Sequence, residues 1–186
     1  SFPLHPHQKR AVWRIVQTGN TYLAHAVGAG KTLEMIVSAM EQRRLGLIRK
    51  PMFAVPNHML NQFAGEFLEA YPAAKILVAD DKAFHTTRRQ RFMAAAALND
   101  LDAVIVTHSA FGLLNTKPDT RKAVVDRMIT DLEAAVEDLG KSQDTRITRQ
   151  RLEQQIERIK RKFEGKASEE GKDRGLDFED MGVDFL

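Results

Sequence analysis

The stretch that decides the fold comprises residues 25–32, with the sequence His-Ala-Val-Gly-Ala-Gly-Lys-Thr. A β-prone run, Thr-Tyr-Leu-Ala at residues 21–24, precedes it, and apolar residues at the helical positions 33, 36, 37 and 40 follow it. A strand, a glycine-rich loop, Lys-Thr and a helix together hold nucleotide phosphates, because backbone N–H groups of the loop and of the helix N-terminus point at the anion. The stretch therefore predicts a phosphate-binding loop.

The residue types in this loop each have a chemical reason. Gly28 and Gly30 let the backbone curve around phosphates without Cβ clashes. Lys31 is the expected catalytic cation, reaching the β- and γ-phosphates, and the Thr32 hydroxyl is the expected Mg²⁺ ligand. The general pattern G-x-x-x-x-G-K-[ST] has its first glycine where this chain has His25. The predicted nucleotide-contacting residues of the loop are His25, Val27, Gly28, Ala29, Gly30, Lys31 and Thr32. The alternative is a structural turn that binds nothing.

Composition narrows the class of protein. The chain has 186 residues, of which 43% are hydrophobic and 28% are charged, and this suits a globular domain with a core. The absence of cysteine excludes disulfides and thiolate metal sites and indicates a reducing, cytoplasmic compartment. The apolar runs are far shorter than the roughly 20 residues that cross a bilayer, so we expect no membrane partner. A net charge of +3 permits a nucleic-acid partner.

Apolar runs alternate with helical patterns along the first part of the chain. Runs at residues 52–55, 75–79 and 103–107 read as buried strands, and the patterns at 6–18, 57–71 and 86–98 read as helices, the second of them capped by Asn57. This alternation predicts a doubly wound α/β fold with a parallel sheet covered on both faces. Ligands bind at the carboxyl ends of such strands, so residues 25–32, 56–57 and 107–108 should share one rim.

The sequence pattern changes at Lys117. Apolar residues at helical spacing predict two helices that pack as an antiparallel hairpin. The expected facing residues are Val125, Met128, Leu132, Ala135 and Leu139 on the first helix, and Leu152, Ile156, Ile159 and Phe163 on the second. Residues 141–166 hold nine Lys/Arg against four Asp/Glu. This basic helix either contacts a nucleic-acid backbone or is a solvated face neutralised by the acidic tail that follows it.

Four motifs, in their order along the chain, resemble the first RecA-like domain of superfamily-two helicases, especially the Swi/Snf-type DNA translocases. They are Leu-His-Pro-His-Gln at residues 4–8, the loop at 25–32, Ala-Val-Pro-Asn at 54–57 and Val-Ile-Val-Thr-His at 104–108. The resemblance spans about residues 2–114. It is nearest to the helicase region of large bacterial or mobile-element proteins that also carry an adenine-DNA methylase.

The resemblance implies a RecA-like P-loop NTPase fold, with ATP and Mg²⁺ as cofactors. It implies that Gln8 contacts the adenine. Contacts to nucleic acid, most often duplex DNA, would come from Pro56, Asn57, Thr107 and His108. A second RecA-like domain, which supplies an arginine finger, would be a further partner.

The resemblance also implies a domain organisation. We expect a RecA-like ATP-binding domain over residues 1–116, an inserted helical hairpin over 117–166, and an acidic linker with the start of a further core strand over 167–186. The family's Asp-Glu box, which holds Mg²⁺ and activates water, has no counterpart in the 186 residues. It would follow a strand like residues 183–186, so the domain is expected to be incomplete at its C-terminus. This fragment should hydrolyse ATP poorly alone.

Two other functions fit parts of the sequence. One is a P-loop kinase or other NTPase that acts on a small molecule, and the other is a non-catalytic interaction module with a vestigial nucleotide site. A metal site formed by His5, His7 and His25 lacks a carboxylate pattern that would complete it. Ser109 follows His108, but no acid is placed to complete a hydrolytic triad.

Overall fold

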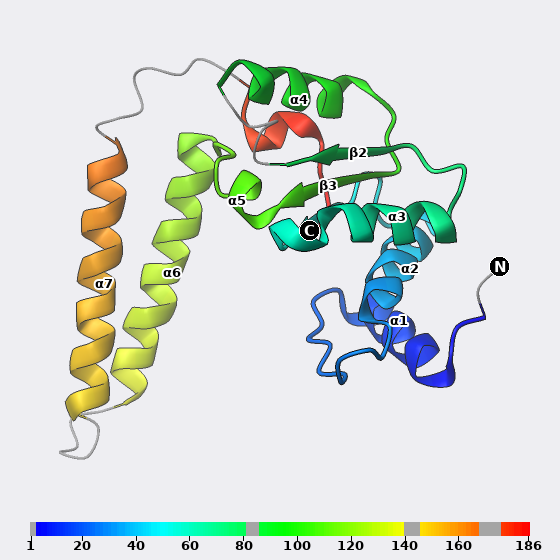
Figure 1. Ribbon diagram of the computed structural model, residues 1–186. Coiled ribbons are helices and arrows are strands. Elements are labelled where there is room, and N and C mark those ends of the chain that lie inside the picture. Colours follow the sequence, from blue (N-terminus) through cyan, green and yellow to red (C-terminus); the bar gives the residue numbers. More distant parts are fainter. Residues whose placement is uncertain (1–2, 81–85, 140–145, 168–175) are drawn as a thin grey trace. The chain divides into compact units, whose positions relative to one another are not determined.

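The computed structural model describes residues 3–80, 86–139, 146–167 and 176–186 (Figure 1). The chain divides into two compact units. The first unit combines Ser1–Asn115 with Leu176–Leu186, and the second is Thr116–Gly175. Each unit is described by itself below.

The first unit is a small α/β domain. Its helices are α1 (Pro6–Thr18), α2 (Lys31–Arg44), α3 (Leu60–Ala70), α4 (Thr86–Leu98) and α5 (His108–Phe111), with 3-10 turns η1 (Asn57–Met59) and η4 (Phe178–Met181). Its strands are β1 (Met52–Val55), β2 (Ile76–Ala79) and β3 (Ala103–Thr107), which form a parallel sheet in the order β1-β3-β2. Val55 lies opposite Thr107, so β1 and β3 end at the same edge. The predicted α/β class with a parallel sheet is confirmed.

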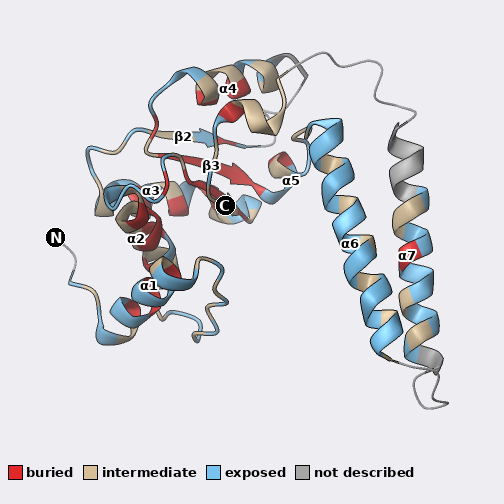
Figure 2. Cartoon of the chain, turned by 180° about the vertical axis from the view of Figure 1, so that it is seen from behind, coloured by how far each residue is buried: buried red, intermediate tan, exposed pale blue. Residues whose placement is uncertain are grey.

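The core lies on both faces of this sheet, around the central strand β3, of which all five residues are buried (Figure 2). One face packs on α4 and η4, and its largest fully buried side chains are Met52, Met93, Val104, Val106 and Met181. The other face packs on α2 and α3 through Ile36, Phe53, Phe63, Phe67 and Ile105. Side chains alternate across a strand, so neighbouring residues of β3 serve opposite faces. Helices on both faces were predicted and are confirmed.

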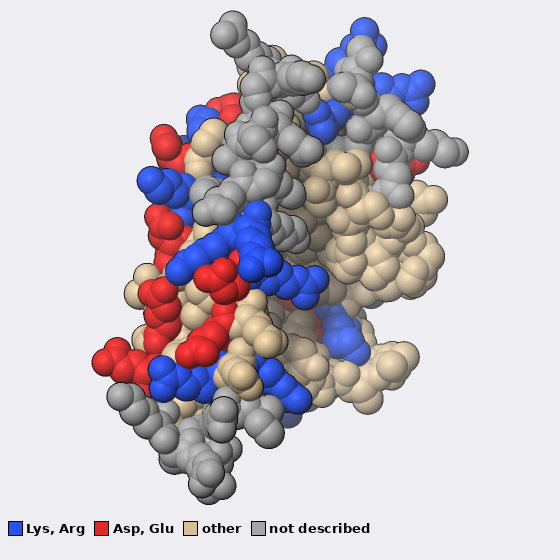
Figure 3. Space-filling view, turned by 90° about the vertical axis from the view of Figure 1, so that its left-hand side faces the viewer, with Lys and Arg blue, Asp and Glu red and all other residues tan. Residues whose placement is uncertain are grey.

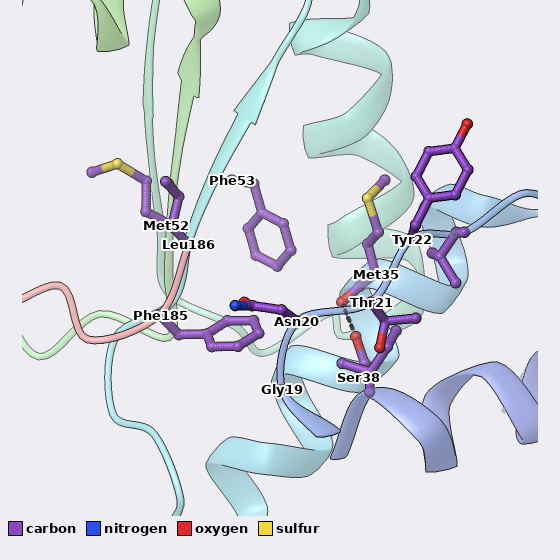
Figure 4. Close-up of a pocket in the computed structure, with 12 residues that line it drawn as sticks. Gly19, Asn20, Thr21, Tyr22, Met35, Ser38, Met52, Phe53, Phe185 and Leu186 are labelled. Carbon is purple, nitrogen blue, oxygen red and sulfur yellow. Dashed lines mark hydrogen bonds between the residues drawn. The ribbon is translucent and has the colours of Figure 1, made fainter. Parts of the chain in front are cut away.

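The predicted strand at residues 21–24 is wrong, because this segment is irregular backbone. It lines one side of an apolar cavity of about 580 Å³, whose other walls include Phe53 and Phe185 (Figure 4). Tyr22 is 91% exposed. A strand needs a neighbour that accepts its backbone hydrogen bonds, and the cavity separates this segment from β1. Strand propensity without an adjacent partner therefore leaves the segment unpaired.

The C-terminal segment lies beside β1. The expected strand at residues 183–186 is reduced to a single parallel bridge between Pro51 and Phe185, with the Met52 N–H donating to the Phe185 carbonyl at 2.8 Å. The Asp184 carboxylate accepts hydrogen bonds from the backbone N–H groups of Arg49 (2.7 Å) and Lys50 (2.9 Å). These bonds anchor the segment at the start of β1.

The second unit contains two long helices, α6 (Pro118–Asp138) and α7 (Arg146–Ala167), which contact each other along their lengths. On α7, Ile156 is buried and Leu152 and Ile159 are half-buried, as predicted, and the side chain of Phe163 lies outside the described part. The predicted stripe on α6 is partly wrong, because Met128 and Ala135 are exposed. Val125 and Leu132 on α6, and Leu139 directly after it, are half-buried as predicted, and the other half-buried apolar residues of this helix are Ile129 and Val136.

Both stripes on α6 satisfy the helical period, since each alternates steps of three and four residues. The observed stripe replaces Met128 and Ala135 by Ile129 and Val136. Branched side chains bury more apolar area than alanine and lose less rotamer freedom than methionine, so this face is the better one to bury.

The surface of the second unit carries both signs of charge. Figure 3 shows Lys and Arg interspersed with Asp and Glu over the face that it presents. Within this unit the Lys160 ammonium lies 3.5 Å from the Glu133 carboxylate across the two helices, and Arg149 lies 3.0 Å from Glu153 along α7. Basic side chains of α7 thus have acidic partners within the hairpin. Of the predicted acidic tail, residues 168–175 lie outside the described part, and Asp177, Glu179, Asp180 and Asp184 belong to the first unit. Exposed pairs of this kind contribute little to stability.

No helix in the described part of the chain is both long and apolar enough to span a lipid bilayer.

Candidate functional site

The loop of residues 25–30 leads directly into α2. Its turn is closed by a hydrogen bond from the Ala29 N–H to the Ala26 carbonyl at 3.3 Å. Gly28 and Gly30 have φ angles of +84° and +81°, a conformation that side chains disfavour, and Gly30 is the N-cap of the helix. The first N–H groups of an α-helix have no acceptor inside it, so α2 presents donors where it meets the loop. This geometry suits an anion.

Lys31 lies across its own loop. Its ammonium donates to the carbonyl oxygens of His25 and Ala26, both at 2.9 Å. The positive charge therefore sits among the backbone atoms that would surround a phosphate. An incoming phosphate oxygen would compete with these two carbonyls for the ammonium, and it has the advantage of its negative charge.

Helix α1 holds the other end of the loop. Gln8 is 4% exposed, its Oε1 accepts from the His5 N–H at 2.8 Å, and its Nε2 donates to the Ala29 carbonyl at 3.5 Å. His7 Nε2 lies 3.1 Å from the same carbonyl. Gln8 thus lies against the predicted loop, and both ends of its amide are engaged within the protein. Val27, at the tip of the loop, is fully exposed.

Glu34 is a site residue that the sequence analysis missed. It is completely buried on the first turns of α2, and its two carboxylate oxygens lie 3.0 and 3.1 Å from His25 Nδ1. The apolar positions of this helix do not include Glu34. The signal that could have found it is polar, because Glu34, Ser38 and Gln42 recur at every fourth residue, and all three are buried. A polar stripe at helical spacing within a packed helix indicates a buried hydrogen-bonding face.

The segments that follow β1 and β3 contact each other, as predicted for residues 56–57 and 107–108. The Ser109 hydroxyl donates to Asn57 Oδ1 at 3.1 Å, and His108 Nε2 lies 3.2 Å from the Ala54 carbonyl. Asn57 does not cap α3 as predicted, since it begins the 3-10 turn η1 after Pro56. Its side chain bonds to Ser109 instead, because the strand ends bring the two residues together.

Thr107 has a structural task. It is 1% exposed, and its Oγ1 accepts from the Ala110 N–H at 3.1 Å, which caps the short helix α5. Asn57 and His108 are exposed beside it, and Pro56 is half-buried. The surface of this part of the rim is therefore formed by the neighbours of Thr107.

Three histidine rings gather at the start of α1 and of the loop. His5 stacks on His7 with ring centroids 5.8 Å apart, and His7 meets His25 edge-on at 5.5 Å. Even so, no three His, Asp or Glu side chains in the described ranges are arranged to hold a metal ion. The rings pack against one another and the loop, and Glu34 is the carboxylate that completes the group.

These features define an α/β domain with a parallel sheet, compatible with a RecA-like domain. Residues 13–186 match the family described as a probable helicase domain. Because the match covers most of the chain, this protein belongs to that helicase-domain family. Comparisons with curated proteins and with solved structures gave no match.

Gly30→Ala should destabilise the domain by about 2 kcal/mol, because the alanine would be held in a left-handed backbone conformation and its Cβ would push the end of the Gln8 side chain away from the Ala29 carbonyl. Gly28→Ala is the matched control, since it has the same sign of φ and open space around its Cβ. Urea unfolding of both variants measures the difference. Adding Gln8→Ala to Gly30→Ala should restore the part of the loss due to the collision. Equal losses at the two glycines would contradict this account.

Proposed function

We propose that this chain is the ATP-binding part of a DNA-dependent ATPase of the Swi/Snf type, which moves along or remodels duplex DNA. The observation that carries the proposal is the position of Lys31. Its ammonium lies inside a glycine loop that opens onto the N-terminus of a 14-residue helix. The loop, the ammonium and the helix N-terminus together offer the hydrogen-bond donors that a nucleoside triphosphate requires.

In this proposal each part of the loop contacts a different part of the nucleotide or its metal ion. Backbone N–H groups of the loop and of α2 hold the phosphate oxygens. Lys31 leaves the two loop carbonyls and binds the β- and γ-phosphates. The Thr32 hydroxyl would be a ligand of Mg²⁺, which would supply positive charge where negative charge develops during phosphoryl transfer. Gln8 lies next to the loop, and it reads the adenine once its amide is released from the Ala29 carbonyl.

DNA contacts in this proposal lie at the carboxyl ends of β1 and β3. Pro56, Asn57 and His108 offer an accessible surface there, and buried Thr107 supports it. Backbone-directed contacts of this kind bind phosphates with little dependence on base sequence.

Hydrolysis needs a carboxylate that orients water and an arginine finger. The sequence Asp-Glu does not occur in the 186 residues. We propose that a second RecA-like domain supplies the arginine finger, and that residues 1–186 bind ATP but hydrolyse it slowly by themselves.

A titration with a fluorescent ATP analogue and Mg²⁺, in the presence and absence of duplex DNA, tests the proposal. Coupling between two ligands is reciprocal, so DNA should change the nucleotide affinity by at least about five-fold if both bind one functional unit. The double variant Asn57→Ala/His108→Ala should lose this coupling and keep the nucleotide affinity. Binding without any effect of DNA would favour an NTPase of small molecules. No nucleotide binding would favour a non-catalytic interaction module.

A further inference from the structure

We propose that buried Glu34 is a positioning residue of the phosphate loop and that it acts through the imidazole of His25. The inference rests on the proposed nucleotide binding and assigns a role to two residues outside the Gly-Lys-Thr core of the motif. Three observations carry it. Glu34 is buried, its carboxylate lies within hydrogen-bond distance of His25 Nδ1, and the backbone carbonyl of His25 accepts a hydrogen bond from the Lys31 ammonium.

Glu34 has no exposed surface, and a buried carboxylate is tolerated when donors compensate its charge. An ionised carboxylate accepts hydrogen bonds and donates none, so His25 Nδ1 carries the proton in the contact of 3.0 Å. This fixes the tautomer and the orientation of the ring, and with them the side chain at the first position of the loop.

The backbone carbonyl of His25 is one of the two acceptors of the Lys31 ammonium. Residue 25 is therefore held on its side-chain end by α2 and on its backbone end by the lysine. The general motif has glycine at this position, which offers no side chain to hold. In this chain an anchored side chain determines where the loop begins.

At the far end of the loop, His7 and Gln8 from α1 contact the Ala29 carbonyl, and His7 Nε2 lies 3.9 Å from the Glu34 carboxylate. Glu34 thus lies between the groups that hold both ends of the loop. A loop that is ordered before the ligand arrives costs less entropy to bind, and this favours higher affinity.

Nucleotide affinity of variants of the 186-residue chain tests the proposal. Glu34→Ala and His25→Ala should each weaken binding of the fluorescent ATP analogue by about ten-fold, as expected for loss of one charge-assisted hydrogen bond. His25→Asn should bind like the wild type, because its Nδ2 is as many bonds from Cβ as the histidine Nδ1. His25→Gln places its amide one bond further and should remain weak. Glu41→Gln, at an exposed ion pair on the same helix, is the control.

An independent readout follows the imidazole itself. The ¹⁵N spectrum of the nucleotide-free protein should show a protonated Nδ1 for His25, and Glu34→Gln should shift that signal. Should Glu34→Ala fail to fold, the three His25 variants still test the route, since this side chain is partly exposed.

The outcomes separate the two proposals. If the wild type binds the nucleotide and His25→Ala binds it with the same affinity, the positioning role is overturned and the proposed function still stands. Equal weakening in His25→Asn and His25→Ala would overturn the route through Nδ1. Failure of the wild type to bind any nucleotide would overturn the proposed function together with this inference.

Discussion

Lys31→Ala is expected to weaken binding of ATP and Mg²⁺ at least about 100-fold, a loss of about 2.7 kcal/mol or more. The variant removes the side-chain cation of Lys31, whose ammonium lies 2.9 Å from two loop carbonyls. Contacts between an ammonium and a phosphate are charge-assisted, and water would replace this one poorly. Isothermal titration of the 186-residue chain measures the effect.

Arg44→Ala is the matched control for this prediction. It removes the same charge from the other end of α2, where the guanidinium pairs with Glu41 at the surface. Affinity should then change by less than about two-fold, since exposed charges outside the site are screened by salt. If Lys31→Ala and Arg44→Ala weakened binding equally, the effect would come from net charge and the loop would lose its assigned role.

Phe67→Ala is expected to lower the free energy of unfolding by about 4 kcal/mol, the largest effect we predict on stability. Phe67 is completely buried on α3, and its ring meets Phe53 of β1 at a centroid distance of 5.9 Å and Tyr71 at 6.0 Å. Truncation removes apolar contacts and leaves a cavity between helix and sheet, which neighbouring rings fill incompletely. Urea unfolding followed by circular dichroism measures the loss.

The adjacent residue provides the control. Leu68 is 41% exposed on the same helix, so Leu68→Ala should lower the free energy of unfolding by less than about 1 kcal/mol. Both substitutions introduce alanine, which raises the helix propensity in each case. Comparable losses at residues 67 and 68 would mean that α3 does not pack on the sheet as described.

The strands and helices of the first unit follow closely from local pattern. The apolar runs at residues 52–55 and 103–107 became β1 and β3 within the predicted bounds, and the helical pattern at 6–18 became α1. These segments are predictable because their own residues provide the burial that stabilises them. Alternation of such segments was sufficient for the α/β class and the parallel sheet.

The failures share one physical cause, which is dependence on a partner outside the segment. Residues 21–24 have strand propensity, yet a cavity lies where a neighbouring strand would have to be. The α6 stripe could run through Met128 or through Ile129 with equal periodicity, and contact with α7 selected the second. Asn57 suits an N-cap, but the strand ends place Ser109 within bonding distance of its side chain.

The glycine loop of residues 25–32, the proposed phosphate loop, shows the same division most clearly. The sequence by itself determined the loop, its two glycines with positive φ and the lysine at the start of α2, because backbone sterics and helix ends are local properties. Tertiary structure alone decided that Gln8 packs on the loop and that Glu34 is buried against His25. These contacts join α1, the loop and α2, and their geometry depends on how two helices pack.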